Sequence, residues 1–190
     1  MGMEYPSNAD LGVIVRKVVR RTLAGTGSAS GGIAPDEPHP PQGGSGPIAL
    51  GSDHGGYELK KIIKQHLEGQ GQTVIDCGTH QTGPVDYPDF ARAVAVLVGG
   101  GQAWRGIMID GAGIGSCMAA NKVPGVRASM CYDHATANNA REHNDANVLT
   151  LGAGLIGVSL AKQIVDTWLA TPFAGGRHAQ RVEKIMGMER

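Results

Sequence analysis

Residues 106–122 read GIMIDGAGIGSCMAANK, and the rest of the chain is arranged around this stretch. The apolar run 107–109 is typical of a buried strand, and the glycines after Asp110 allow a tight turn before a helix, which we expect to start near Met118. Backbone N–H groups exposed in such a turn attract anions. Asp110 stands at the mouth of the turn and is a candidate proton acceptor. The motif alone fits equally well a plain strand-to-helix turn in which Asp110 only caps the helix.

Short apolar runs alternate with helical patterns on both sides of this unit. Strands are predicted from residue 48 and over 73–78, 106–109, 126–131 and 148–152, and helices over 57–70, 89–101, 133–141 and 157–170. A loop with Arg177, His178 and Arg181 leads into a short terminal helix. Alternating strands and helices favour a parallel sheet covered on both faces. The predicted fold class is therefore α/β, a Rossmann-like three-layer sandwich with a five-stranded parallel sheet.

The composition limits the classes of function. The chain has 190 residues, with 17 basic and 17 acidic side chains, so its balanced charge does not point to nucleic acid or to an anionic membrane. Its three cysteines form no CxxC pair, which argues against a disulfide framework and against a zinc site. No apolar run approaches the ~18 residues needed to cross a bilayer. We expect a cytoplasmic protein that uses no metal or cofactor and has no nucleic-acid or membrane partner.

The N-terminal part differs in character from the rest. Residues 8–24 carry apolar side chains at helical spacing with basic side chains on the opposite side, which predicts a short amphipathic helix. Residues 25–47 are rich in Gly, Pro and Ser and almost free of large apolar side chains, which is typical of a flexible linker. The expected organisation is a helical segment over 1–24, a linker over 25–47 and a folded domain over 48–190.

Three interpretations of the N-terminal helix stay open. It could pack on its own domain, it could be a mitochondrial-type presequence, which Glu4, Asp10 and the linker disfavour, or it could dock on a partner. The helix-plus-linker layout resembles the encapsulation peptides that tether enzymes inside bacterial microcompartment shells. That resemblance implies a shell protein as partner through residues 8–24 and a location inside a microcompartment.

Five strings in the folded part follow one another in a distinctive order. They are DHGG at 53–56, DYPD at 86–89, GAGIG with AANK within 111–122, REHNDANVL at 141–149 and GGRHAQRV at 175–182. Together they resemble the ribose-5-phosphate isomerase B family, which includes the galactose-6-phosphate isomerase subunits. The resemblance runs from residue 48 to about residue 186. It implies a metal-independent aldose–ketose isomerase that works through a cis-enediolate, and a homodimer or tetramer whose sites combine two subunits.

The resemblance also implies roles for individual residues. Asp110 matches the position of a catalytic base and His143 the histidine that opens the sugar ring. The residues implied in binding the sugar phosphate are Asp53, His54, Tyr87, Gly111, Ala112, Gly113, Ile114, Gly115, Asn144, Arg177 and Arg181. Such a reaction needs an acid and a base, donors for the enediolate oxygen and cations for the phosphate.

The chain departs from the family pattern at several positions. One branch of the family has a cysteine where Asp110 stands, and another has a glutamate where Ser116 stands. A carboxylate can perform the same proton transfer, although its reach differs from that of a thiolate. Cys117 is expected to be a packing residue. Gly154 and Ala135 replace an arginine and an aromatic residue that are usual in the family, which predicts a roomier pocket with a weaker grip on phosphate.

Ribose 5-phosphate is the expected substrate and ribulose 5-phosphate the expected product. Two alternatives stay open, namely the isomerisation of a six-carbon or deoxy sugar phosphate and a non-catalytic protein that only binds sugar phosphates. A titratable side chain at position 110 favours an enzyme, because a protein that had lost the reaction would not need one there.

Overall fold

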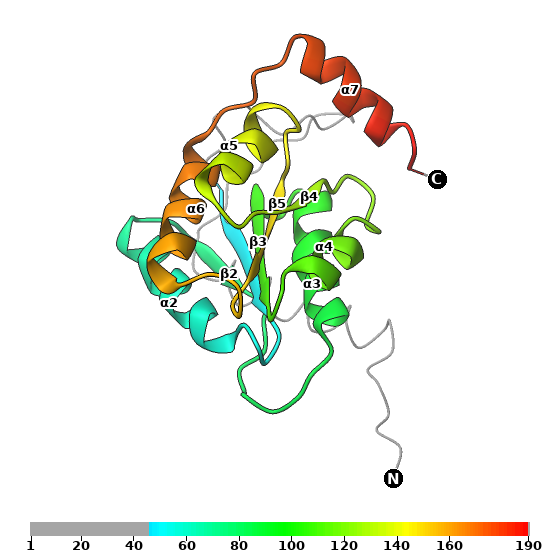
Figure 1. Cartoon of the computed structure of the whole chain (residues 1–190). Helices are drawn as coiled ribbons and strands as arrows, with labels where there is room; N and C mark the ends of the chain where they lie inside the picture. Colours follow the sequence, from blue (N-terminus) through cyan, green and yellow to red (C-terminus); the bar gives the residue numbers. More distant parts are fainter. Residues whose placement is uncertain (1–45, 190) are drawn as a thin grey trace, which may run out of the picture. The chain divides into compact units, whose positions relative to one another are not determined.

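Five parallel strands form the sheet at the centre of the structure (Figure 1). The computed structural model describes residues 46–189. The strands are β1 (Ile48–Ser52), β2 (Val74–Asp76), β3 (Arg105–Asp110), β4 (Ala128–Met130) and β5 (Val148–Gly152), in the order β2-β1-β3-β5-β4. Every residue of β1, β3 and β5 is buried, as expected of parallel strands covered on both faces.

Helices cover the two faces of the sheet (Figure 1). One face carries α2 (Tyr57–Gly69), α5 (His134–Glu142) and α6 (Val158–Ala170), and the other carries α3 (Tyr87–Gly99) and α4 (Ile114–Ala120). The fully buried Trp168 of α6 and Ile63 of α2 pack with Ile107 and Leu149 of the sheet in one core cluster. The last helix, α7 (Arg177–Met186), has no buried residue. This arrangement confirms the predicted three-layer α/β fold.

The strand order creates a switch point between β1 and β3. From β1 the chain passes through α2 to β2 on one side, and then through α3 back across to β3 on the other side. In open α/β sheets, ligands bind in the crevice outside the carboxyl ends of the strands at such a point. Asp53 follows β1 directly and Asp110 is the last residue of β3, so both carboxylates lie where the topology favours a ligand.

Most predicted elements form where they were expected, and the differences have local causes. α4 begins at Ile114 rather than near Met118, because the Asp110 carboxylate accepts the N–H of Ser116 and so caps the first turn. α3 begins at Tyr87, which was expected in a loop, with Pro88 in its first turn, where proline is tolerated.

The remaining differences concern the sheet edges and the tail. β2 and β4 each span three residues, fewer than predicted, because each pairs with one neighbour only. Arg177 and Arg181 lie within α7 and not in a loop before it. No helix within residues 46–189 has the length and apolar character to span a bilayer. The predicted amphipathic helix at 8–24 and the linker up to residue 45 lie outside the described residues.

Candidate active site

The Asp110 carboxylate, at the end of β3, accepts four hydrogen bonds. Oδ1 accepts the N–H groups of Ala112, at 2.8 Å, and of Gly113. Oδ2 accepts both the N–H of Ser116, at 3.3 Å, and its hydroxyl. Asp110 is 4% exposed and Ser116 is fully buried. An ionised carboxylate offers about four lone-pair sites, so a further proton can bind Asp110 only where one of these four donors changes its role.

Three further N–H groups of the same turn stay free. Within residues 46–189, the N–H groups of Gly111, Ile114 and Gly115 have no hydrogen-bond partner. The turn that exposes them depends on Gly113, whose φ of +79° is one that residues with a side chain rarely adopt. The free N–H groups of Ile114 and Gly115 are adjacent, and adjacent free N–H groups in a turn attract anions. Of the predicted anion hole, these three N–H groups are open to a ligand, whereas those of Ala112 and Gly113 are occupied by Asp110.

Asp53 and His54 follow β1 and lie beside the glycine turn. The N–H of Asp53 donates to the carbonyl of Ile109 at 3.3 Å, and its Oδ1 accepts the N–H of Gly56 at 2.9 Å. His54 Nδ1 accepts the N–H of Val85 at 3.2 Å. The neutral imidazole of His54 therefore carries its proton on Nε2, from which it can donate to a ligand oxygen. The His54 side chain is 41% exposed, so a ligand can reach it.

Tyr87 reaches the glycine turn from the start of α3. A Cβ atom at Gly115 would lie 2.5 Å from the Tyr87 hydroxyl oxygen, so the ring lies directly against the turn. The loop before Tyr87 is tied to the domain by Lys60, which is 1% exposed. Its Nζ donates to Asp76 Oδ1 and to the Thr79 carbonyl, each at 2.7 Å.

His143 and Asn144 follow α5, and both form hydrogen bonds with Asn139. The Asn139 amide nitrogen lies 2.8 Å from His143 Nδ1 and donates to it, which leaves the proton of the neutral ring on Nε2. Asn144 Nδ2 donates to the Asn139 carbonyl at 3.1 Å and to its Oδ1 at 3.3 Å. His143 Nε2 also faces the Glu142 carboxylate at 3.9 Å. His143 is thus oriented to hold or release a proton at Nε2.

Helix α7, which carries Arg177 and Arg181, contacts His143 through His178. The His178 ring stacks on that of His143 with centroids 4.2 Å apart and an interplanar angle of 2°. Desolvation, together with nearby His143, Arg177 and Arg181, lowers the pKa of His178, which favours the neutral ring. Arg177 and Arg181 are exposed, and within residues 46–189 neither forms an ion pair. Both guanidinium groups are therefore available to an external anion.

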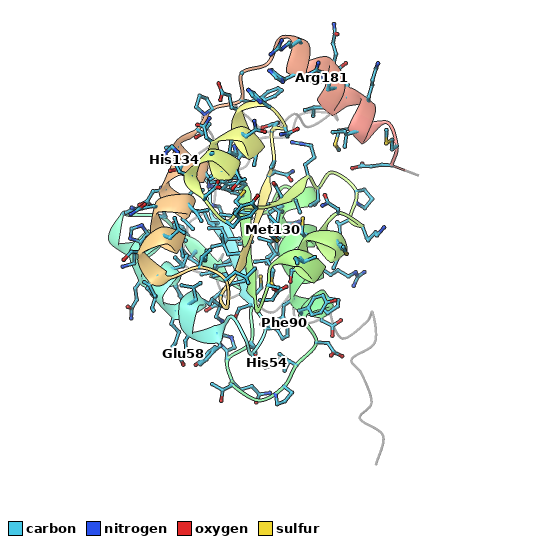
Figure 2. All side chains as sticks on the ribbon, in the orientation of Figure 1. His54, Glu58, Phe90, Met130, His134 and Arg181 are labelled. Carbon is cyan, nitrogen blue, oxygen red and sulfur yellow. The ribbon has the colours of Figure 1, made fainter. Side chains whose placement is uncertain are left out.

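The predicted site residues form two separate groups. The turn group, at the carboxyl ends of the strands, contains Asp53, His54, Tyr87 and residues 110–115. The arginine group, at the amino ends, contains His143, Asn144, Arg177 and Arg181, because α5 returns the chain to the start of β5. Figure 2 shows His54 and Arg181 at opposite ends of the domain formed by residues 46–189. One chain does not bring the two groups together.

Sequence reasoning missed the partners that hold the two candidate catalytic residues. The spacing of Asn139 and His143, four residues apart on a helix, was a signal for one contact. No spacing rule marks the contact between Ser116 and Asp110. Burial raises the pKa of the Cys117 thiol, whose Sγ donates to the Ala128 carbonyl at 3.3 Å, which fits a packing role. No group of His, Cys, Asp or Glu side chains that could hold a metal ion occurs within residues 46–189.

These features define a class of protein. A parallel α/β sheet with a hydrogen-bonded carboxylate at its switch point, free N–H groups beside it and oriented histidines is typical of an enzyme that moves protons on a small anionic substrate.

The comparisons with known proteins name the family within that class. The family model described as Ribose/Galactose Isomerase matches residues 48–185. Ribose-5-phosphate isomerase B of Escherichia coli (strain K12) is 48% identical over 142 residues, which is 75% of this chain and 95% of that protein. D-erythrulose-4-phosphate isomerase of Pectobacterium atrosepticum is 45% identical over 140 residues, which is 73% of this chain and 91% of that protein.

The solved structures agree with the sequence matches. Ribose-5-phosphate isomerase B of Clostridium thermocellum superposes with a TM-score of 0.75 at 54% identity, covering 75% of this chain and 97% of that one. The chain belongs to the ribose/galactose isomerase family. It is an aldose–ketose isomerase for sugar phosphates, of the ribose-5-phosphate isomerase B type, which confirms the resemblance based on the five strings.

Proposed function

We propose that the protein interconverts ribose 5-phosphate and ribulose 5-phosphate through a cis-enediolate. The observation that carries the proposal is the buried Asp110 carboxylate beside three free N–H groups, in a domain that spans 95% of a ribose-5-phosphate isomerase B. A carboxylate next to fixed N–H donors suits a reaction in which a proton leaves carbon and negative charge develops on the neighbouring oxygen.

Each step of the reaction has a residue with suitable geometry. His143, with its proton on Nε2, opens the furanose ring by exchanging protons with the ring oxygen and the C1 hydroxyl. Asp110 then takes the C2 proton, the C2–H electron pair forms the enediolate double bond, and the C1 carbonyl becomes an oxyanion. The free N–H groups of the glycine turn stabilise that oxyanion. The C2 hydroxyl proton moves to the C1 oxygen, and return of the proton from Asp110 to C1 then gives the ketose. Arg177 and Arg181 hold the phosphate.

We propose that the working unit is a homodimer and that two such dimers can pair as a tetramer. In the dimer, each site joins the turn group of one chain to the arginine group of its partner. The separation of the two groups within one chain supports this arrangement. Four exposed apolar side chains lie on the elements next to the turn group, namely Ile114, Met118, Tyr132 and Leu155. A twofold symmetric pair would cover such a surface and create two identical sites.

A second substrate class has support from Gly154. This residue donates its N–H to the Gly111 carbonyl at 2.9 Å, so it lies at the glycine turn, where the family pattern has an arginine. With no side chain at Gly154 and a small one at Ala135, the pocket has room for a different sugar phosphate. The relative that isomerises D-erythrulose 4-phosphate is nearly as similar as those named for ribose 5-phosphate.

The test of the substrate is a comparison by NMR. Equal amounts of enzyme are given ribose 5-phosphate, erythrose 4-phosphate, allose 6-phosphate and 2-deoxyribose 5-phosphate, and the ketose is measured as it appears. We expect kcat/KM to be highest for ribose 5-phosphate. A higher value for any of the other sugars would replace the proposed substrate, although the isomerase reaction would stand.

We also propose that residues 8–24 dock the enzyme on a microcompartment shell protein. The support is the sequence pattern of an amphipathic segment on a linker, which leaves the catalytic domain complete from residue 48. A segment of this length gains its helix only when the apolar side is buried by a partner.

Removing residues 1–45 is expected to leave kcat/KM unchanged and to abolish co-assembly with the shell. This cut keeps Pro47, whose carbonyl accepts the N–H of Trp104 at 3.1 Å. A full-length control carries Asp in place of Ile14, Val18 and Leu23 and should lose co-assembly as well. Activity assays and co-sedimentation with purified shells check both proteins. An inactive or unfolded truncated protein would place the N-terminal segment in the catalytic domain.

A further inference from the structure

The four groups that donate hydrogen bonds to Asp110 differ in whether they can also accept one. Three are backbone N–H groups, of Ala112, Gly113 and Ser116, whose directions are fixed by the strand, the turn and the helix. The fourth is the Ser116 hydroxyl, which bonds to Oδ2 and is fully buried. A backbone N–H can only donate, whereas a hydroxyl can donate or accept by rotating its proton.

This difference decides which carboxylate oxygen can take a proton. When a carboxylate becomes a carboxylic acid, the protonated oxygen turns from an acceptor into a donor. A proton on Oδ1 would face two N–H donors, which cannot change role. Oδ2 faces one such donor, the N–H of Ser116, and one hydroxyl. A protonated Oδ2 can donate a hydrogen bond to Ser116 Oγ once the hydroxyl has rotated, while its remaining lone pair still accepts the N–H. Only Oδ2 therefore keeps a suitable partner in both protonation states.

We infer that Ser116 is a positioning residue that makes Asp110 Oδ2 the atom that exchanges the substrate proton. This inference rests on the proposed role of Asp110 as base. In the first half of the reaction the C2–H bond breaks, an O–H bond forms at Oδ2 and the electron pair goes to the enediolate. In the second half the Oδ2 proton returns to C1, and the C2 hydroxyl proton moves to the C1 oxygen. Ser116 accepts the hydrogen bond from Oδ2 in between and donates to it before and after.

The inference predicts a shift in the pH dependence of the reaction. Donation by Ser116 to the anion is charge-assisted and stronger than its acceptance from the neutral acid, so the hydroxyl favours the ionised base. Ser116→Ala removes that preference. The acidic limb of kcat/KM should then move to higher pH by about one unit, because the base becomes protonated sooner as the pH falls. The plateau value should fall by about tenfold, because the protonated intermediate loses its partner.

Other titratable groups near the turn do not account for such a shift. They are Asp53 and His54 after β1, Tyr87 at the start of α3 and Cys117 in α4; residues 153–158, which follow β5, include none. Among the described residues, none of these groups makes a hydrogen bond to Asp110. The substrate phosphate and the His143 side chain are the same in every variant.

Thr150→Val is the matched control. Thr150 is fully buried, and its hydroxyl donates to the Gly113 carbonyl at 2.8 Å, so it supports the same turn without bonding to Asp110. Loss of this hydroxyl loosens the turn to a similar degree and should leave the acidic limb in place. Ser116→Cys fills nearly the same space with a weaker donor and should give a smaller shift than Ser116→Ala, which guards against a failure of one variant to fold.

The experiment is the pH profile of kcat/KM for ribose 5-phosphate with the wild type, Ser116→Ala, Ser116→Cys, Thr150→Val and Asp110→Asn, each checked for folding by thermal unfolding. A large loss in Asp110→Asn with a shifted limb in Ser116→Ala supports the inference. A large loss in Asp110→Asn with an unshifted limb in folded Ser116→Ala, or an equal shift in Thr150→Val, overturns the inference alone. Retained activity in Asp110→Asn overturns the proposed base itself.

Discussion

Asp110→Asn is expected to lower kcat by ~10²-fold or more, because the amide keeps the shape of the side chain but has no basic lone pair to take a proton from carbon. The substitution also disturbs the turn. An amide has one acceptor oxygen and one NH2 group, so it cannot accept from all four donors around position 110. We therefore expect a loss of stability of about 1–3 kcal/mol beside the loss of turnover.

Asp110→Cys separates the two effects. The same N–H groups and the Ser116 hydroxyl would surround a thiol at position 110 and favour its thiolate, which can act as a base. This variant should be at least about tenfold more active than Asp110→Asn at a pH where the thiolate is populated. Steady-state kinetics and thermal unfolding on both proteins check the prediction. A folded Asp110→Asn with near wild-type kcat would reduce Asp110 to a helix cap.

Mixing two inactive chains is expected to restore activity, because the turn group lies at the carboxyl ends of the strands and the arginine group at their amino ends. One chain carries Asp110→Asn, and the other carries Arg177→Ala with Arg181→Ala. In a mixed dimer, the site that joins the intact turn group of the second chain to the intact arginines of the first is complete. With random exchange of equal amounts, about half of the dimers are mixed and activity should reach about a quarter of the wild-type value.

The complementation needs two controls. Each chain alone should stay near its own low activity after the same treatment, and native mass spectrometry should show that subunits have exchanged. Complete exchange without any gain in activity would contradict a site shared between chains. The two groups would then have to meet by a rearrangement within one chain.

Much of the fold was predictable because it depends on short-range patterns. The strand-to-helix turn at 110–115 and the alternation of buried strands with amphipathic helices were enough to predict a parallel sheet with helices on both faces. The two edge strands, β2 and β4, are shorter than predicted because each pairs on one side only. An apolar run in the sequence does not show on how many sides a strand is paired. The start of α4 came out earlier because the hydrogen bond from Ser116 to Asp110 outweighs the weak helix preference of the glycines.

The candidate site was predictable in its residues but not in its geometry. The five strings identify which residues matter, yet no sequence pattern shows that Arg181 lies away from His54 in the same chain (Figure 2). The sequence also does not show that the Asp110 carboxylate itself accepts two of the N–H groups of the glycine turn. Both facts follow from how distant elements pack, and the stack of His143 on His178 is a third example.

The central claim is that a proton, rather than a hydride, moves between C1 and C2 of a sugar phosphate. The direct measurement is 1H NMR of the ribose 5-phosphate and ribulose 5-phosphate mixture held at equilibrium with the enzyme in D2O. A base such as Asp110 exchanges its proton with solvent in some fraction of turnovers, so the signals of the aldose C2–H and of one ketose C1–H should disappear over many turnovers. If the two sugars interconvert through hundreds of turnovers while both signals keep their full intensity, the enediolate mechanism is contradicted.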